Sequence, residues 1–400
     1  MPTEDMEADL LTKQKYSLRL LVRFIYYLGL GDYWFETESR NYSKIYKIYS
    51  RTAASFVFII YLDQWLSLFR ELSDQEKNDV LVFNVGQTVI ITKTLVLLSI
   101  RSKSKVVLKR LLEDNKNIPE EYQKASVIKS VKYCMLFFGA VYSTVFSYTV
   151  IAIKDKYVHG EELNIEVVLY PSPSSPGLLA VILRPLVAFH WWWLVTIMYA
   201  TDAFITFALV FTGYRFKCLK LYFKELGIEV EKKMKDGENM EEIGEEYCQD
   251  VVTGIKMHED ALWCARNIQN SLGKIYSIQI LATIILISIN LIRIVSIQRP
   301  LINSLPDITY ICGLLFMCGT FMTSAGDITI EASELSQSMC YSGVLSLCGR
   351  SGRRARTLVA VAMMRAVQPV HMTAFGVVHL THRNFISVIR ASYSFYAVMH

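Results

Sequence analysis

Three ionisable side chains lie inside apolar runs, where a charge is costly and usually marks a functional or a paired group. In helices that rise 1.5 Å per residue, Asp63 and Lys93 would stand at heights that differ by roughly 6 Å. A lysine side chain spans that gap, so we predict an ion pair between Asp63 and Lys93. Asp202 falls toward the inner end of its run and is expected to face the cytoplasm.

Histidines near the C-terminus raise the possibility of a zinc site. His379 and His382 are three residues apart and would share a helical face, with His371 before them. A membrane hydrolase would need further ligands from other spans, and only His190 qualifies. Because a closed zinc site needs three or four ligands, we predict that the chain holds no metal.

Catalytic signatures are missing from the sequence. It contains no Gly-x-Ser-x-Gly, Walker or Gly-x-Gly-x-x-Gly pattern. We therefore predict that the chain is not an enzyme, and we expect neither a cofactor nor a nucleic-acid partner.

The elements that must position these side chains are membrane helices. The 400 residues are 52% hydrophobic and 20% charged, which is more apolar than a typical soluble domain. An apolar run of about 20 residues can cross a bilayer as a helix. Seven runs approach or exceed that length, and we expect an all-α membrane protein with spans at 52–69, 80–100, 131–153, 186–211, 275–297, 308–324 and 373–399. Residues 16–30 are amphipathic and too short to span, so they are expected to lie on the inner membrane surface.

The orientation of the spans follows from lysine and arginine in the loops, which favour the cytoplasm. Residues 1–51 carry eight of them, residues 101–132 nine and residues 350–365 five. The loops on the other side carry two or three each. We therefore predict a cytoplasmic N-terminus and, after seven crossings, an extracellular C-terminus.

This topology is opposite to that of the G-protein-coupled receptors. None of the eight cysteines falls in a predicted outer loop, where rhodopsin-like receptors usually form a disulfide. Asp-Arg-Tyr and Asn-Pro-x-x-Tyr motifs are also missing at the expected places.

Residues 215–274 form a charged segment with periodic apolar residues. The pattern predicts a helix that breaks at Gly237 and a second helix that starts near Met240. The segment suits either a solvated loop of helical tendency or a cytoplasmic layer that anchors subunits to one another.

The last apolar run has a small, weakly polar face. Gly376, Leu380, Asn384, Ser387 and Ala391 recur at steps of three and four residues. This face suits close helix packing in a membrane, and it equally suits the wall of a water-filled path.

The end of the chain resembles the C-terminal signature of the insect odorant receptors. Thr373-Ala374, then Leu380-Thr381, Phe385, Arg390 and the stretch 392–396 (SYSFY) follow the order and the spacing of that signature. His382-Arg383 stands where the family usually has an apolar and an acidic residue.

The resemblance implies a subunit of an odorant-gated, non-selective cation channel in the plasma membrane of sensory dendrites. It implies a tetramer with co-receptor subunits, joined by the cytoplasmic layer and surrounded by membrane lipid. Its pore is lined by the last helix, which gives the pore and gate candidates Val377, Leu380, Thr381 and Asn384.

The resemblance also implies a small-molecule pocket between spans two, three, four and six. The pocket candidates are Phe83, Gln87, Thr88, Phe146, Tyr148, His190, Leu194, Met198, Tyr310 and Leu314. Most are apolar or aromatic, as pockets for volatile organic molecules require.

We expect one receptor domain over residues 1–400. Its predicted parts are a cytoplasmic segment at 1–51, spans one to four at 52–211, a cytoplasmic helical segment at 212–274, spans five and six at 275–326, a cytoplasmic segment at 327–367 and the pore-lining span at 368–399. A gustatory-type channel and, less favoured, a metabotropic seven-helix receptor are the alternatives.

Overall fold

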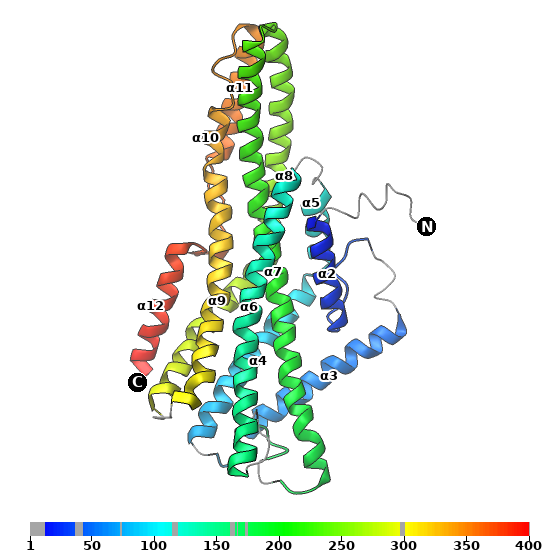
Figure 1. The fold of residues 1–400 in the computed structure, drawn as a ribbon, viewed down its shortest axis with the longest axis vertical. Coiled ribbons are helices and arrows are strands. Elements are labelled where there is room, and N and C mark those ends of the chain that lie inside the picture. Colours follow the sequence, from blue (N-terminus) through cyan, green and yellow to red (C-terminus); the bar gives the residue numbers. More distant parts are fainter. Residues whose placement is uncertain are drawn as a thin grey trace.

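The chain folds into a bundle of helices with one small β-hairpin (Figure 1). The computed structural model describes residues 13–36, 43–72, 74–113, 119–160, 165, 167–172, 175–296 and 301–399. The elements in chain order are α2 (Lys13–Tyr27), α3 (Lys44–Ser67), α4 (Asp74–Ser99), α5 (Arg101–Glu113), α6 (Glu120–Lys154), the π-helix η3 (Asp155–His159), α7 (Leu178–Lys235), α8 (Met240–Ser296), α9 (Leu301–Ser333), α10 (Leu335–Cys340), α11 (Gly349–Ala366), β1 (Thr373–Ala374), β2 (Val378–His379) and α12 (His382–Met399).

Two very long helices organise the bundle. α7 has 58 residues and α8 has 57, so each is about 86 Å long at 1.5 Å per residue. They are joined by a short turn in which Gly237 has φ +77°, a conformation that glycine adopts without strain. The predicted helix break at Gly237 is therefore confirmed. The cytoplasmic helices expected from residues 215–274 are continuous extensions of two predicted spans.

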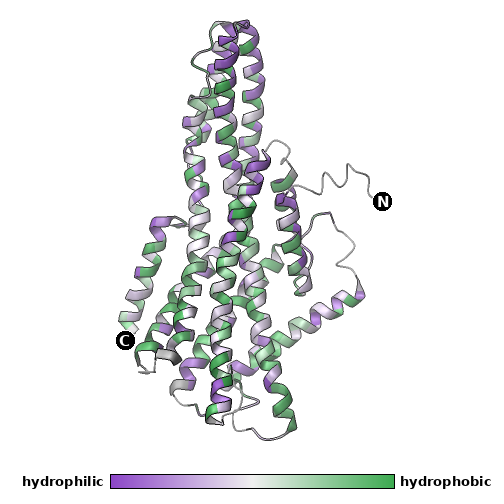
Figure 2. Cartoon of the chain, in the orientation of Figure 1, coloured by the Kyte–Doolittle hydropathy of each residue, from purple (hydrophilic) through white to green (hydrophobic). Residues whose placement is uncertain are grey.

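Hydropathy divides the molecule along its long axis. Hydrophilic residues are frequent and alternate with hydrophobic ones at the end where α7 meets α8, together with α10 and α11, whereas the opposite part is largely hydrophobic (Figure 2). Within the described residues, five helices are long and apolar enough to cross a membrane, namely α4, α6, α7, α8 and α9. α3 covers most of the predicted first span and α12 covers residues 382–399 of the predicted seventh, and neither helix is among the five. Seven crossings and the orientation remain predictions.

Two hydrophobic cores follow this division. The larger core lies in the apolar part and includes buried residues of α2, α4, α6, α7, α8 and α9. The smaller one, here named the distal core, joins residues 219–230 of α7 and 243–251 of α8 to α10 and α11. Gly227 permits this packing, since a Cβ there would lie 2.8 Å from the backbone oxygen of Tyr341.

The N-terminal amphipathic segment is helical as predicted. α2 buries Leu18, Val22 and Ile25, which recur at helical spacing, and the helix packs on α6 and α7. Its place on a membrane surface remains a prediction.

The last span is not one helix over 373–399, so that prediction is wrong. Residues 373–379 form the β1–β2 hairpin, and the helix begins only at His382. α12 packs against α8 and α9 at the outside of the bundle (Figure 1).

Candidate ligand cavity and pore segment

A narrow cavity, here named the central cavity, lies in the middle of the apolar part. Its walls come from α4, α6, α7, α8 and α9, and it offers about 40 Å³ to the centres of water molecules. Met198, Tyr310 and Leu314, three of the predicted pocket residues, line it. Such a space holds a few water molecules, whereas pockets for organic ligands usually measure about 300–1,000 Å³. A ligand would therefore have to widen it by moving side chains or helices.

One end of the central cavity carries a buried charged pair. Lys93 Nζ lies 2.5 Å from Asp202 Oδ1, and the two side chains are 2% and 1% exposed. Lys93 also donates a hydrogen bond of 2.8 Å to Gln279 Oε1. Lys93 and Gln279 line the cavity, so a ligand there would meet one strongly polar group in a wall that is apolar apart from Thr144 and Tyr310.

This pair corrects two predictions. Lys93 pairs with Asp202 and not with Asp63, and Asp202 does not face the cytoplasm. The reason is the position of each residue in its helix. Asp63 lies close to the end of α3 at Ser67, beside the connection to α4, whereas Lys93 lies close to the far end of α4 at Ser99. Asp63 instead accepts a hydrogen bond of 3.3 Å from the backbone N–H of Tyr170.

A second buried ionic cluster lies farther along α8. Arg293 contacts Asp79 of α4 at 2.9 Å and Asp307 of α9 at 3.2 Å. Tyr148 of α6 donates a hydrogen bond of 2.9 Å to Asp307 and accepts one of 3.2 Å from Arg293. The cluster thus ties four helices of the cavity wall together. It also engages the hydroxyl of Tyr148, a predicted pocket residue.

Of two further predicted residues, Phe83 approaches the cavity through aromatic contacts, and His190 packs on an aromatic ring of α3. The Phe83 ring lies 5.3 Å from the Tyr148 ring and 5.1 Å from the ring of Trp191, which lines the cavity. His190 is fully buried, and its ring lies 5.9 Å from that of Phe56.

The remaining predicted pocket residues occupy other surroundings. Gln87 is fully buried, and the Thr88 hydroxyl lies 3.0 Å from that of Tyr61. Phe146 is 63% exposed on α6. Leu194 lines a different cavity on the other side of α7. Their roles in ligand binding stay predictions.

The pore candidates lie around the β-hairpin. Thr373 pairs with His379 and Ala374 with Val378, and the turn between them places Phe375 and Gly376 at φ +55° and +73°. Because this part of the chain is not helical, the four-residue steps before Asn384 do not stack, and His379 and His382 share no helical face.

The four candidates differ in exposure and in bonding. Val377 is 74% exposed on the turn, whereas Leu380 is 1% exposed and its N–H donates to the Met372 oxygen at 2.9 Å. The Thr381 hydroxyl accepts a hydrogen bond from the Asn384 N–H at 3.2 Å and caps α12. Asn384 Nδ2 donates to the backbone oxygen of His379 at 2.8 Å.

The hairpin and α12 are attached to α8, the helix that also walls the central cavity. Gln269 Oε1 accepts the N–H of Thr373 at 2.9 Å, and the Ser277 hydroxyl accepts that of Phe375 at 2.7 Å. Farther along, Ser288 donates to the backbone oxygen of Ser392 at 2.7 Å. A shift of α8 at Gln279 would therefore displace both the hairpin, which is bonded to Gln269 and Ser277, and α12, which is bonded to Ser288.

Sequence reasoning missed Gln279, Arg293 and Asp307. Each is a polar or ionisable residue within or beside a predicted span, and that is a signal of a buried partner. Arg293 and Asp307 contact each other across the connection between α8 and α9, whereas their other partners and that of Gln279 lie more than a hundred residues away, so the sequence pattern did not reveal them.

Comparisons with known proteins agree with this architecture. The family model described as 7tm Odorant receptor matches residues 75–393. The structure of the insect olfactory receptor OR5 from Machilis hrabei in complex with eugenol superposes with a TM-score of 0.77 at 12% identity, covering 96% of this chain and 97% of that one. The structure of the same receptor described without eugenol gives a TM-score of 0.76 at the same identity and coverage. No curated protein sequence matches the chain.

Proposed function

The chain belongs to the 7tm odorant receptor family, and from this premise we propose that it is the odorant-binding subunit of a ligand-gated, non-selective cation channel. The observation that carries the proposal is the central cavity. It is enclosed by five helices, and its apolar walls have the Lys93–Gln279 group at one end. Such a site suits a small volatile molecule with an apolar body and one hydrogen-bond acceptor.

The channel is proposed to form with co-receptor subunits in the plasma membrane of sensory neurons. The pore is formed by the last segments of several subunits, with Val377, Leu380, Thr381 and Asn384 as the candidate residues. Val377 and the apolar residues Ile386 and Phe395 of α12 are exposed in the single chain, which supports contacts with neighbouring subunits.

α8 is proposed to transmit ligand binding to the pore. The ligand widens the cavity against Gln279 and its neighbours on α8, and the bonds of Gln269, Ser277 and Ser288 carry the shift to the last segment. Binding opens the pore only to the extent that the ligand prefers the open state.

The test is expression with a co-receptor in oocytes and recording of currents against a panel of volatile molecules. Met198→Ala and Tyr310→Ala remove cavity walls and should shift the concentration for half-maximal response about tenfold or more for at least one odorant, because each removes roughly 1.5–3 kcal/mol of apolar contact.

Met135→Ala is the matched control, since Met135 lies on α6, is 63% exposed and lines no part of the cavity. It should leave the dose–response curve unchanged. If both cavity variants reach the surface and respond like the control to every active odorant, the central cavity is not the binding site. Currents that require a G protein would favour the metabotropic alternative.

A further inference from the structure

A second and larger cavity, here named the lateral cavity, opens on the other side of α7. It has a volume of about 1,090 Å³, and its walls come from the connection between α2 and α3, from α3 and α4, from the start of α5 and from α7. Helical spacing separates the two cavities, because Trp191, Val195 and Met198 of α7 face the central one. Trp193, Leu194 and Ile197 face the lateral one.

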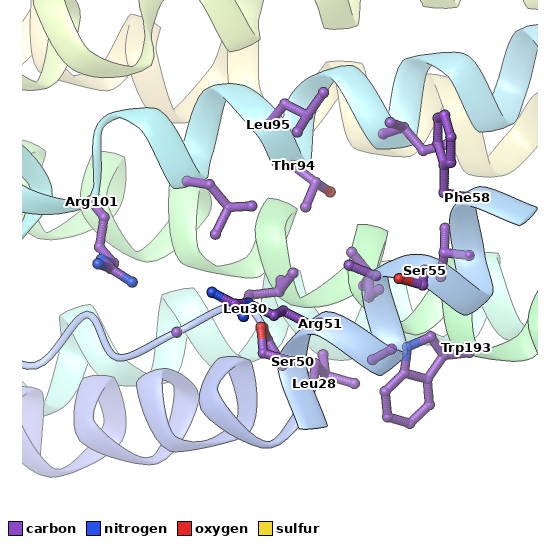
Figure 3. A pocket seen from close by; sticks show the side chains of 18 of the residues that line it. Leu28, Leu30, Ser50, Arg51, Ser55, Phe58, Thr94, Leu95, Arg101 and Trp193 are labelled. Atoms are coloured by element: carbon purple, nitrogen blue, oxygen red, sulfur yellow. The ribbon is translucent and has the colours of Figure 1, made fainter. Parts of the chain in front are cut away.

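The lateral cavity is amphipathic along its length. Figure 3 shows Arg51 and Arg101 toward one end and Phe58 and Trp193 toward the other. Lys47 and Lys105 also line the cavity, and none of its described lining residues is acidic. Arg51, Arg101 and Lys105 gather three positive charges at this end, which makes it complementary to an anion.

The apolar walls are open at the side of the bundle. Phe58 of α3 is 55% exposed and Leu95 of α4 is 60% exposed, although both belong to the apolar part of the molecule. Leu98 of α4, toward the basic end, is 38% exposed. In a bilayer these side chains face hydrocarbon, so an acyl chain can enter between α3 and α4 without crossing water.

The basic end is held in place by hydrogen bonds. The Tyr46 hydroxyl accepts the N–H of Gly31 at 2.9 Å and donates to the backbone oxygen of Tyr26 at 2.9 Å. The Ser50 hydroxyl donates to the backbone oxygen of Gly29 at 2.6 Å. Arg101 lies against Gly31, where an added Cβ would come within 2.7 Å of its Nη1. Residues 28–31, directly after α2, are thereby held in place as a wall of the cavity.

We propose that the lateral cavity binds an anionic phospholipid from the membrane leaflet next to it. The phosphate and the anionic headgroup contact Arg51, Arg101 and Lys105. One acyl chain lies along Phe58, Leu95 and Trp193. Guanidinium groups bind phosphate oxygens in pairs, and basic pockets between membrane helices are suited to anionic headgroups. The proposal concerns a membrane lipid and does not depend on which odorant the chain binds.

The test uses Trp193 as a reporter of the acyl chain. The purified full chain and Trp193→Phe are reconstituted in nanodiscs of phosphatidylcholine that contain either brominated phosphatidylserine or brominated phosphatidylcholine. Bromine quenches a nearby indole, so the difference between the two proteins isolates the quenching of Trp193. We expect several-fold stronger quenching of Trp193 by the brominated phosphatidylserine.

Charge variants test the headgroup site. Arg51→Gln combined with Arg101→Gln should weaken the apparent affinity for phosphatidylserine roughly tenfold to thirtyfold, at about 1 kcal/mol per basic residue near the membrane surface. Lys103→Gln combined with Lys109→Gln is the control, because it removes the same charge from α5 outside the cavity lining. The control pair should change the affinity less than twofold.

Three results would overturn the proposal. Equal quenching of Trp193 by the two brominated lipids would show that the cavity does not select an anion. Equal losses in the two double variants would show a diffuse effect of surface charge. Competition by soluble glycerophosphoserine as strong as that of the lipid would place the binding at the headgroup alone. The quenching in the unsubstituted chain decides the first point even if a variant fails to fold.

Discussion

Lys93 and Asp202 place two full charges in the apolar interior of the bundle, and removing one leaves the other without compensation. We expect Lys93→Met or Asp202→Leu alone to lower the free energy of unfolding by about 3–5 kcal/mol. The double variant should lie closer to the unsubstituted chain, since apolar pairs can replace buried ion pairs. Thermal unfolding in detergent measures these differences.

The partly exposed pair between Lys129 and Asp327 is the matched control. Its atoms lie 2.6 Å apart, but its side chains are about one third exposed. Lys129→Met should therefore cost about 0–1 kcal/mol. If Lys129→Met and Lys93→Met lower the free energy of unfolding equally, then leaving Asp202 without its partner costs no more than breaking a partly exposed ion pair.

His258 gives the distal half of α8 a dependence on pH. Burial, together with Arg365, lowers the pKa of His258 from 6.5 to about 4. Between about pH 4 and pH 6.5 the unfolded chain binds a proton at His258 that the folded chain does not. The free energy of unfolding therefore has its full value above about pH 6.5 and decreases as the pH drops toward about 4. His258→Gln should flatten this part of the pH profile. Unfolding midpoints of both proteins across that window provide the measurement, and parallel profiles would speak against the assignment.

At the scale of elements, the hairpin before α12 changes what is expected of the pore candidates. Leu380→Ala should reduce surface expression, since truncating a buried leucine costs about 2–5 kcal/mol. Val377→Ala should leave expression intact and change resting current or ion selectivity. Reversal potentials in shifted ionic mixtures, recorded with surface labelling, separate the two effects.

Val398→Ala serves as the control, because Val398 is 85% exposed near the end of α12, far along the helix from the turn. If Val377→Ala and Val398→Ala give the same currents as the unsubstituted channel, the turn does not line the pore.

Long helices can be predicted from the sequence more reliably than short irregular segments. The apolar runs in α7 and α8 are longer than any β-strand, so their length alone identifies them as helices. The stretch 373–379 could not be separated from α12 in this way, because a short apolar run fits either structure. Gly376 was the available signal, since a glycine inside such a run often marks a turn. Partners distant in sequence, such as Asp202 for Lys93, depend on which helices pack together.

At the scale of the whole molecule, orientation can be measured directly. An epitope tag at the N-terminus should be stained only in permeabilised cells, whereas a tag at the C-terminus should be stained in intact cells. The expectation rests on the lysine and arginine excess of residues 1–51, 101–132 and 350–365. If both tags are stained on the same side, the chain crosses the membrane an even number of times. In that case α3 or α12 does not cross it.

The unbroken course of α7 and α8 has a mechanical consequence. These helices wall the central cavity and form the distal core without interruption, so each is expected to shift as one rigid rod. The chain between α11 and α12, residues 367–381, contains no helix, and the β1–β2 hairpin is its regular secondary structure. In the proposed channel this stretch is the hinge on which α12 swings. Opening then requires a few backbone rotations, at the microsecond-to-millisecond pace of hinge motions, and no bending of a rod about 86 Å long.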